Sequence, residues 1–271
     1  MNKDKKYTSF LDIILIQWNV YISFCSIALM FYFQLLKSVS FSLLEYIFVF
    51  LSTFLSYNLL RLPFLFKQKG KWSKESYFLE IVFYIVIILA YFCFTWIQIL
   101  AFAFLFTVTI FYRYPLFFSS ELRRINYLKI FIIAFVWVAG IIIVPLFDKK
   151  SSTILISYIP LYIAQVLLFI AITLPFDDAD QLKDDFKTIP KKIGSKKTKI
   201  VSLVLMAFYL IISVYTLKDI SEKLAHIAIA LVSCVMIILY KKEKNEKFLF
   251  YGMDGIILIQ TFLLYLFRQF L

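Results

Sequence analysis

The sequence predicts an all-α, polytopic membrane protein, a bundle of nine transmembrane helices with its amino terminus inside and its carboxyl terminus outside. Of its 271 residues, 62% are hydrophobic, against roughly 45–50% in soluble globular domains. These residues form long apolar runs, and the basic residues gather between the runs. Helices are expected because a bilayer requires every backbone polar group to be bonded internally.

Nine apolar runs are candidates for membrane spans, each of which needs about 20 mostly apolar residues. The first run follows three lysines as in a signal peptide, but it is too long and lacks a small-residue cleavage site, so we expect a retained helix. The third and fourth runs are divided only around Phe94–Trp96, which predicts a tight hairpin. The expected spans are 10–36, 40–66, 77–94, 95–112, 130–147, 154–174, 200–217, 224–240 and 248–268.

The distribution of basic residues predicts the topology. Most of the 29 lysines and arginines lie before the first span or in segments 67–74, 113–129, 183–199 and 241–247. With nine spans, all of these fall on one side, which the positive-inside rule identifies as the inside. We therefore expect one transmembrane domain, 1–271, in a bacterial plasma (inner) membrane with its active face cytoplasmic. The net charge of +12 reflects this topology, because no nucleic-acid-binding signature is present.

Several polar side chains within the spans are expected to be structural. Asn19, Gln98 and Gln165 are expected to form hydrogen bonds between helices. Glu45, near the outer interface, is expected to be solvated. His226 is the only histidine and is not expected to be catalytic. The three cysteines have neither pairing nor metal-ligand spacing; they are Cys25, Cys93 and Cys234.

The main functional signal is an acidic stretch that follows the sixth run, Pro-Phe-Asp-Asp-Ala-Asp-Gln-Leu-Lys-Asp-Asp at 175–185. If the helix continues through it, Asp177, Asp180 and Asp184 lie on one face at i, i+3 and i+7. Such carboxylates repel one another unless a cation joins them, and Mg²⁺ favours carboxylate oxygens and phosphorylated ligands. The alternative is a solvated acidic loop balanced by nearby lysines.

The nine spans, the large inner segments and this Asp-x-x-Asp-x-x-x-Asp motif together resemble the UbiA family of membrane prenyltransferases. Segments 174–177 and 187–190, followed by Ile-Gly, are similar to the family's second aspartate motif and its tail, and Asp254-Gly255 is similar to a common family ending. The resemblance implies that Asp177, Asp180 and Asp184 hold Mg²⁺ and a prenyl diphosphate. It also implies that Lys187 contacts the diphosphate.

The sequence departs from the family pattern at two places. The first family motif, Asn-Asp-x-x-Asp-x-x-x-Asp, corresponds here to Tyr-Asn-Leu-Leu-Arg-Leu-Pro at 57–63, where only Asn58 remains. The family's Tyr-x-x-x-Lys keeps Tyr114 but has Phe118 in place of the lysine. The basic residues that could substitute for this lysine in space are Arg123, Arg124 and Lys129.

Arg61 lies one helical turn from Asn58 on the same face. An arginine at bilayer depth costs about 2.5–3.5 kcal/mol on insertion scales, so we expect compensation. It either reaches the inner headgroups or faces a polar cavity and pairs with a diphosphate, Asp254 or Asp177. We hypothesise that Arg61 supplies directly the positive charge that relatives obtain from aspartates and Mg²⁺.

The sequence thus predicts a UbiA-like prenyltransferase that transfers a prenyl group from a prenyl diphosphate to a lipophilic acceptor, such as an aromatic one, with Mg²⁺ assistance. The alternative is a non-catalytic isoprenoid-binding, lipid-binding or assembly protein. A transporter is disfavoured because the chain has five glycines and no visible inverted repeat. Expected partners are the two substrates and the bilayer, without nucleic acid. The predicted substrate-binding residues are Asn58, Arg61, Tyr114, Lys187 and Asp254, and the predicted catalytic residues are Asp177, Asp180 and Asp184.

Overall fold

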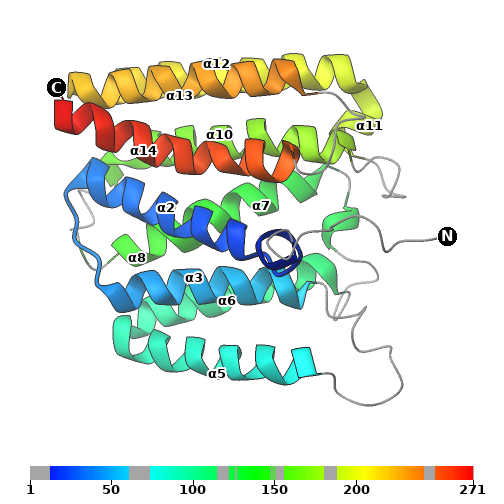
Figure 1. The fold of residues 1–271 in the computed structure, drawn as a ribbon, viewed down its shortest axis with the longest axis vertical. Coiled ribbons are helices and arrows are strands. Elements are labelled where there is room, and N and C mark those ends of the chain that lie inside the picture. Colours follow the sequence, from blue (N-terminus) through cyan, green and yellow to red (C-terminus); the bar gives the residue numbers. More distant parts are fainter. Residues whose placement is uncertain are drawn as a thin grey trace.

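The computed structural model shows long helices that lie side by side along one direction (Figure 1). Every regular element in the described part of the chain is helical. The structure describes residues 13–60, 74–114, 122–125, 127–147, 149, 156–179, 188–240 and 248–270.

Nine apolar helical segments form the bundle in the described part of the chain. Eight are long and apolar enough to cross a membrane, and α3 is a shorter apolar helix. The predicted fold class is therefore confirmed. The segments are α2 (Val20–Lys37), α3 (Leu43–Leu59), α5 (Lys74–Cys93), α6 (Trp96–Arg113), α7 (Leu128–Val138) continuing through η3 (Ala139–Ile143) into α8 (Val144–Leu146), α10 (Ile159–Ala179), α12 (Ser195–Thr216), α13 (Ile220–Leu239) and α14 (Gly255–Phe270).

Short elements lie at the ends of these helices. They are the π-helical η1 (Ile13–Gln17), the 3₁₀ turn η2 (Leu122–Arg124), α11 (Ile189–Ile193) and the π-helical η5 (Phe248–Asp254). The start of α2 and the end of α14 lie at opposite ends of the bundle in Figure 1. This arrangement agrees with the odd number of membrane crossings that the distribution of basic residues predicts. The identity of the membrane remains a prediction.

The predicted hairpin between the third and fourth spans is confirmed. Helix α5 ends at Cys93 and α6 begins at Trp96. Thr95 caps α6 in a capping box with Gln98, whose Oε1 accepts a hydrogen bond of 3.0 Å from the Thr95 N–H. The amide nitrogen of Gln98 donates to the carbonyl of Val144, at 2.8 Å, and so ties α6 to α8.

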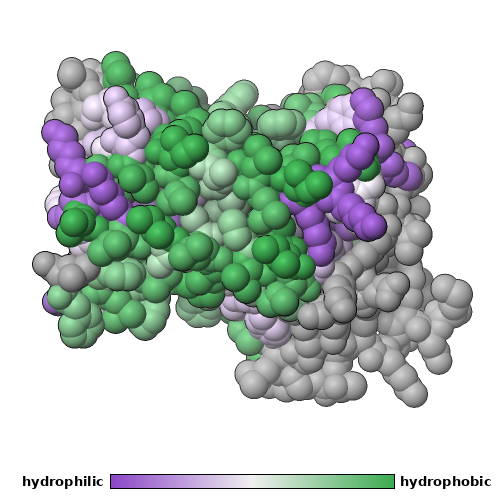
Figure 2. All heavy atoms as spheres, turned by 90° about the horizontal axis from the view of Figure 1, so that it is seen from above, coloured by the Kyte–Doolittle hydropathy of each residue, from purple (hydrophilic) through white to green (hydrophobic). Residues whose placement is uncertain are grey.

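The outer surface of the bundle is suited to lipid. Figure 2 shows a broad apolar band with hydrophilic residues towards the two ends of the helices. Large apolar side chains such as Phe92, Leu100 and Ile211 are more than half exposed. A continuous apolar surface of this kind would favour aggregation in water, but in a bilayer it contacts the hydrocarbon.

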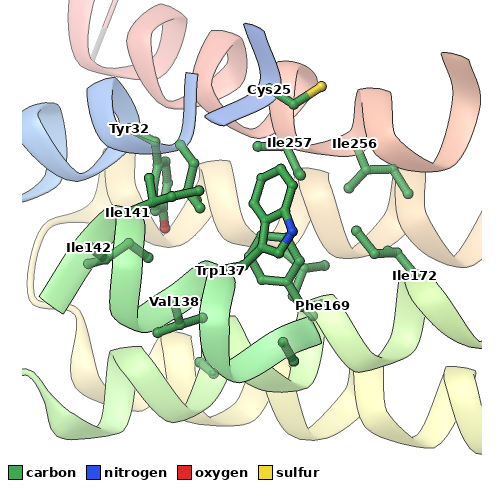
Figure 3. Packing of buried hydrophobic residues seen from close by; sticks show 14 of the residues in the cluster. Cys25, Tyr32, Trp137, Val138, Ile141, Ile142, Phe169, Ile172, Ile256 and Ile257 are labelled. Atoms are coloured by element: carbon green, nitrogen blue, oxygen red, sulfur yellow. The ribbon is translucent and has the colours of Figure 1, made fainter. Parts of the chain in front are cut away.

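The interior between α2, α7, α10 and α14 is filled with apolar side chains (Figure 3). The rings of Trp137 and Phe169 lie 5.2 Å apart, and both side chains are buried. Close approach of α14 to α2 requires a glycine, because a Cβ on Gly255 would lie 2.7 Å from the hydroxyl of Tyr21. That hydroxyl donates to the carbonyl of Tyr251 at 3.1 Å.

Buried polar side chains connect the helices as the sequence predicts. Asn19 donates to Asn58 at 3.2 Å, which joins the start of α2 to α3. Gln165 and Gln260 exchange hydrogen bonds of 3.2 and 3.1 Å between α10 and α14. His226 is buried against the hydroxyl of Tyr32, a structural contact. The three cysteines are free thiols.

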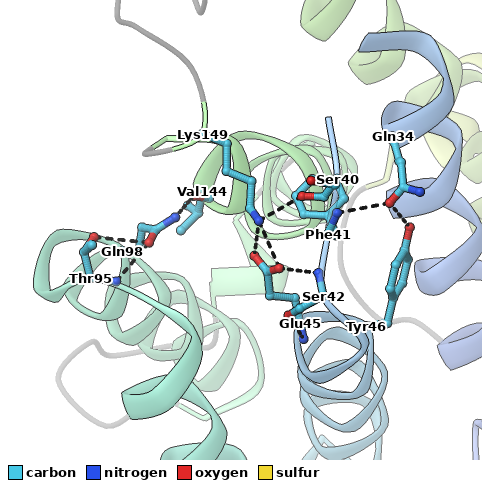
Figure 4. Close-up of polar contacts among 10 residues, drawn as sticks. All are labelled: Gln34, Ser40, Phe41, Ser42, Glu45, Tyr46, Thr95, Gln98, Val144 and Lys149. Carbon is cyan, nitrogen blue, oxygen red and sulfur yellow. Dashed lines mark hydrogen bonds and ion pairs between the residues drawn. The ribbon is translucent and has the colours of Figure 1, made fainter. Parts of the chain in front are cut away.

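The expectation that Glu45 is solvated is wrong. Its side chain is buried and accepts a hydrogen bond of 2.6 Å from the Ser42 N–H at the start of α3 (Figure 4). Lys149 pairs with the same carboxylate at 3.0 Å and donates to the carbonyl of Ser40. The capping box at the start of α3 fixes the carboxylate of Glu45 in this buried position. Burial is tolerated because Lys149, from a distant segment, neutralises its charge.

We therefore expect Lys149→Met to destabilise the protein. The substitution leaves the buried carboxylate of Glu45 without its cation, and we expect a loss of about 1–3 kcal/mol in unfolding free energy. The measurement is the thermal midpoint of the purified protein in detergent. Lys218→Met, at an exposed position, is the matched control. Equal melting of both variants and the wild type would contradict a stabilising role for this ion pair.

Candidate functional site

The candidate site begins at the carboxyl end of α10. This helix continues to Ala179, so its last turn contains Asp177, the first residue of the motif, and the adjacent Asp178. Pro175 lies within the helix and removes one N–H from its hydrogen-bond ladder. Asp177 and Asp178 are nevertheless buried, with exposed fractions of 2% and 0%. Buried carboxylates at the end of a membrane helix require compensating partners.

Lys129, in the first turn of α7, provides the partner of Asp177. Its ammonium nitrogen lies 2.7 Å from Asp177 Oδ1. The pair is largely shielded from solvent, because the Lys129 side chain is only 15% exposed. The structure thus brings one of the three suggested substitute cations to the acidic motif. The alternative of a solvated acidic loop does not hold for Asp177.

Asp178 is a member of this region that the sequence argument did not single out. Its Oδ1 accepts a hydrogen bond of 2.7 Å from the hydroxyl of Ser195, at the start of α12. Gly194 precedes this serine with φ of 81°, a backbone conformation that favours glycine. The Gly-Ser pair in the sequence could have predicted the start of a helix. Only the packing of α12 on α10 shows that the hydroxyl of this serine binds Asp178.

Asn58 holds helices together in this structure. Its amide nitrogen donates to the carbonyls of Trp18 at 3.0 Å and Phe54 at 2.7 Å. Its side-chain oxygen accepts from Asn19. The described contacts therefore give Asn58 a structural role, and its contact with a substrate remains a prediction.

Tyr114 joins the end of α6 to the end of α3. Its hydroxyl donates to the carbonyl of Leu59 at 2.9 Å. Burial raises the pKa of the Tyr114 hydroxyl, so this donor keeps its proton at neutral pH. The contact of Tyr114 with a substrate remains a prediction. The predicted site residues outside the described part of the chain are Arg61, Asp180, Asp184 and Lys187.

Asp254 ends the π-helical segment η5 and is partly buried. Its backbone carbonyl accepts a weak hydrogen bond from the Cys25 thiol at 3.5 Å. This contact places Asp254 against α2. Short π-helical segments are frequent at functional sites.

The described residues do not by themselves form a magnesium site. Among them, no group of three or more histidine, cysteine, aspartate or glutamate side chains could hold a metal ion. Asp177 also already has a cationic partner in Lys129. The predicted Mg²⁺ ligand set therefore depends on Asp180 and Asp184.

A separate apolar cavity of about 550 Å³ lies in another part of the bundle. Helices α3, α5, α6 and α7 line it together with η3. Tyr57 and Trp137 belong to its wall, and the indole N–H of Trp137 donates to the Tyr57 hydroxyl at 3.0 Å. The cavity therefore shares Tyr57 and Trp137 with the packed apolar interior.

These features define a polytopic helical membrane bundle with an enclosed ion pair at one end. No family model matches the sequence, and no curated protein is similar to it in sequence. Two solved structures share the fold. A UbiA homologue from Aeropyrum pernix K1 has a TM-score of 0.66 and 15% identity, over 91% of this chain and 98% of that one.

The second structure is a digeranylgeranylglyceryl phosphate synthase, with a TM-score of 0.56 and 16% identity. The similarity covers 95% of each chain. This protein therefore has the UbiA fold, as the resemblance of its motifs implied. At this level of identity the similarity establishes the fold, and the activity has to be argued from the site.

We expect Asn58→Ala to destabilise the bundle by about 1–3 kcal/mol, because buried partners in the start of α2 lose their hydrogen bonds. The thermal midpoint in detergent measures this effect. Thr107→Ala is a matched control, because it removes an exposed hydroxyl that bonds within α6. A variant that melts like the wild type but no longer binds a prenyl diphosphate would instead identify Asn58 as a ligand contact.

Proposed function

We propose that this protein is a UbiA-type membrane prenyltransferase. It binds a prenyl diphosphate at the end of the bundle that contains Asp177 and Lys129, and it transfers the prenyl group to a lipophilic acceptor. The carrying observation is the buried Lys129–Asp177 pair, at 2.7 Å, where the acidic motif begins. The shared fold of the two prenyltransferase-related structures supports the same class of reaction.

The proposed chemistry requires positive charge where the diphosphate leaves. The bond between C1 of the prenyl group and the diphosphate oxygen breaks, and the diphosphate departs with the electron pair. The acceptor forms a new bond to C1 and releases a proton. Fixed cations stabilise the departing charge. Lys129 provides one ammonium group near the site, and we assign Arg61 and Lys187 as further diphosphate contacts.

Asp177 has two tasks in this proposal. It fixes the ammonium group of Lys129, and it contributes to the acidic motif with Asp180 and Asp184. Magnesium assistance is part of the proposal because these three carboxylates match the ligand preference of that ion. We propose the cytoplasmic face of a bacterial inner membrane as the location, because most basic residues fall on that side of the predicted topology.

A second candidate is a non-catalytic protein of the same fold that binds an isoprenoid or another lipid. Two observations favour it. The amide of Asn58 is engaged with α2, and the centre of the bundle is packed by Trp137 and Phe169 (Figure 3). A protein packed in this way could bind a lipid at its charged end without catalysing a reaction.

A transfer assay separates the two candidates. Purified protein in proteoliposomes is incubated with labelled prenyl diphosphates of several chain lengths, with and without Mg²⁺, and released pyrophosphate is measured. We expect Mg²⁺-dependent release that falls by about 10²–10³-fold in Asp177→Asn, because a fixed electrostatic contact is lost. Glu80→Gln, an exposed carboxylate on α5, is the control. No release by the wild type under any condition supports the non-catalytic alternative.

Arg61 is tested by equilibrium binding of a prenyl diphosphate. We expect Arg61→Ala to lower the affinity by about tenfold or more, because a charged contact to phosphate is worth about 1.5–3 kcal/mol. Arg61→Lys retains the charge without the planar fork and should recover part of the loss. Unchanged affinity of the alanine variant would overturn the hypothesis that Arg61 replaces a metal-binding motif.

A further inference from the structure

The apolar cavity of about 550 Å³ is spatially distinct from the ion-paired end of α10. Helix α5 packs on α3, whereas α6 packs on α7, α8 and η2. The cavity occupies the space between these two packing groups. Its rim includes Ile87, Tyr91 and Trp96, which are 49%, 65% and 71% exposed on the apolar surface of the bundle. The cavity therefore opens towards the hydrocarbon of the bilayer.

Among the described residues that line the cavity, none is charged. A diphosphate or a carboxylate placed there would lose its hydration without gaining an opposite charge, at a cost of several kcal/mol. The cavity thus disfavours a prenyl diphosphate and favours an uncharged molecule. Its volume falls within the range of roughly 300–1,000 Å³ that is typical of small-molecule sites.

Helix α3 places hydroxyl groups in this otherwise apolar wall. Ser52 and Ser56 are one turn apart and share a face. The hydroxyl of Ser52 is buried without a hydrogen-bond partner among the described residues. Tyr57 accepts a hydrogen bond of 3.0 Å from the indole N–H of Trp137 at the same wall. The unused hydroxyl of Ser52 matches a ligand that carries an acceptor oxygen.

We infer that this cavity binds a neutral lipophile that enters from the bilayer. Its apolar body lies against α5 and α6, and a carbonyl oxygen faces the hydroxyls of α3. Gly140 of η3 also lines the cavity, without a side chain of its own. Identification of this lipophile as the acceptor of prenyl transfer rests on the proposed function, whereas the binding site itself does not.

The test uses the full-length protein in lipid nanodiscs with two diazirine-labelled probes, a decylbenzoquinone and a decylbenzene of similar shape. Both are expected to label α3, α5, α6 or α7. Ser52→Ala combined with Ser56→Ala should lower affinity for the quinone by about five- to tenfold, as expected for one lost hydrogen bond. The decylbenzene should bind unchanged. Equal loss of both probes, or no loss of the quinone, would overturn the proposed role of the hydroxyls.

A second variant tests the cavity itself. Ala90→Phe places a ring in the cavity and should abolish saturable labelling by both probes, while Ala207→Phe, on the exposed face of α12, should not. Melting temperatures confirm that both variants fold. Labelling that survives in Ala90→Phe, or that maps outside the cavity walls, overturns the inference.

The same preparations separate this inference from the proposed function. Wild-type protein that is labelled in the cavity but releases no pyrophosphate supports the cavity site and contradicts the transferase. Farnesyl diphosphate serves as a charged competitor and should not displace the quinone. Displacement at concentrations that saturate the charged end would overturn the assignment of the cavity to a neutral ligand.

Discussion

The structure depends on one constraint, which is that polar groups inside a bilayer must find partners within the protein. Side-chain amides meet this constraint along the bundle. Asn19 bonds to Asn58, Gln165 to Gln260, and Gln98 to the carbonyl of Val144. The first and third bonds join consecutive spans, whereas the Gln165–Gln260 pair joins α10 to α14, which are distant in the sequence. The surrounding apolar packing supplies most of the contact area.

Charged side chains follow the same constraint at the ends of the helices. Glu45 pairs with Lys149, Glu222 with Arg268, and Asp177 with Lys129. Each pair joins residues from separate segments of the chain. The pair at Asp177 also belongs to the acidic motif, where we propose that the same ammonium group contacts a phosphorylated ligand. Replacement of one partner in such a pair is costly, because it leaves a buried charge without compensation.

The arrangement divides the protein into a charged end and a neutral cavity. Buried carboxylates and the ammonium group of Lys129 lie at the end of α10, whereas the described walls of the cavity between α3 and α6 carry hydroxyls and no charged side chain. A reaction between a charged prenyl donor and a lipophilic acceptor needs both environments close to each other. Tyr57 and Trp137 line the cavity, and Trp137 also packs on Phe169 of α10 in the interior.

The sequence by itself determined the helical class, the nearly complete set of spans, the hairpin around Phe94–Trp96 and the structural amides, because apolar run length is a property of neighbouring residues. It also located the acidic motif at the end of α10. Only the tertiary structure decided that Lys129 meets Asp177, that Asp178 meets Ser195 and that Glu45 is buried against Lys149. These contacts join residues that are far apart in the chain, and side-chain spacing along one helix carries no information about which charge of another helix packs against it.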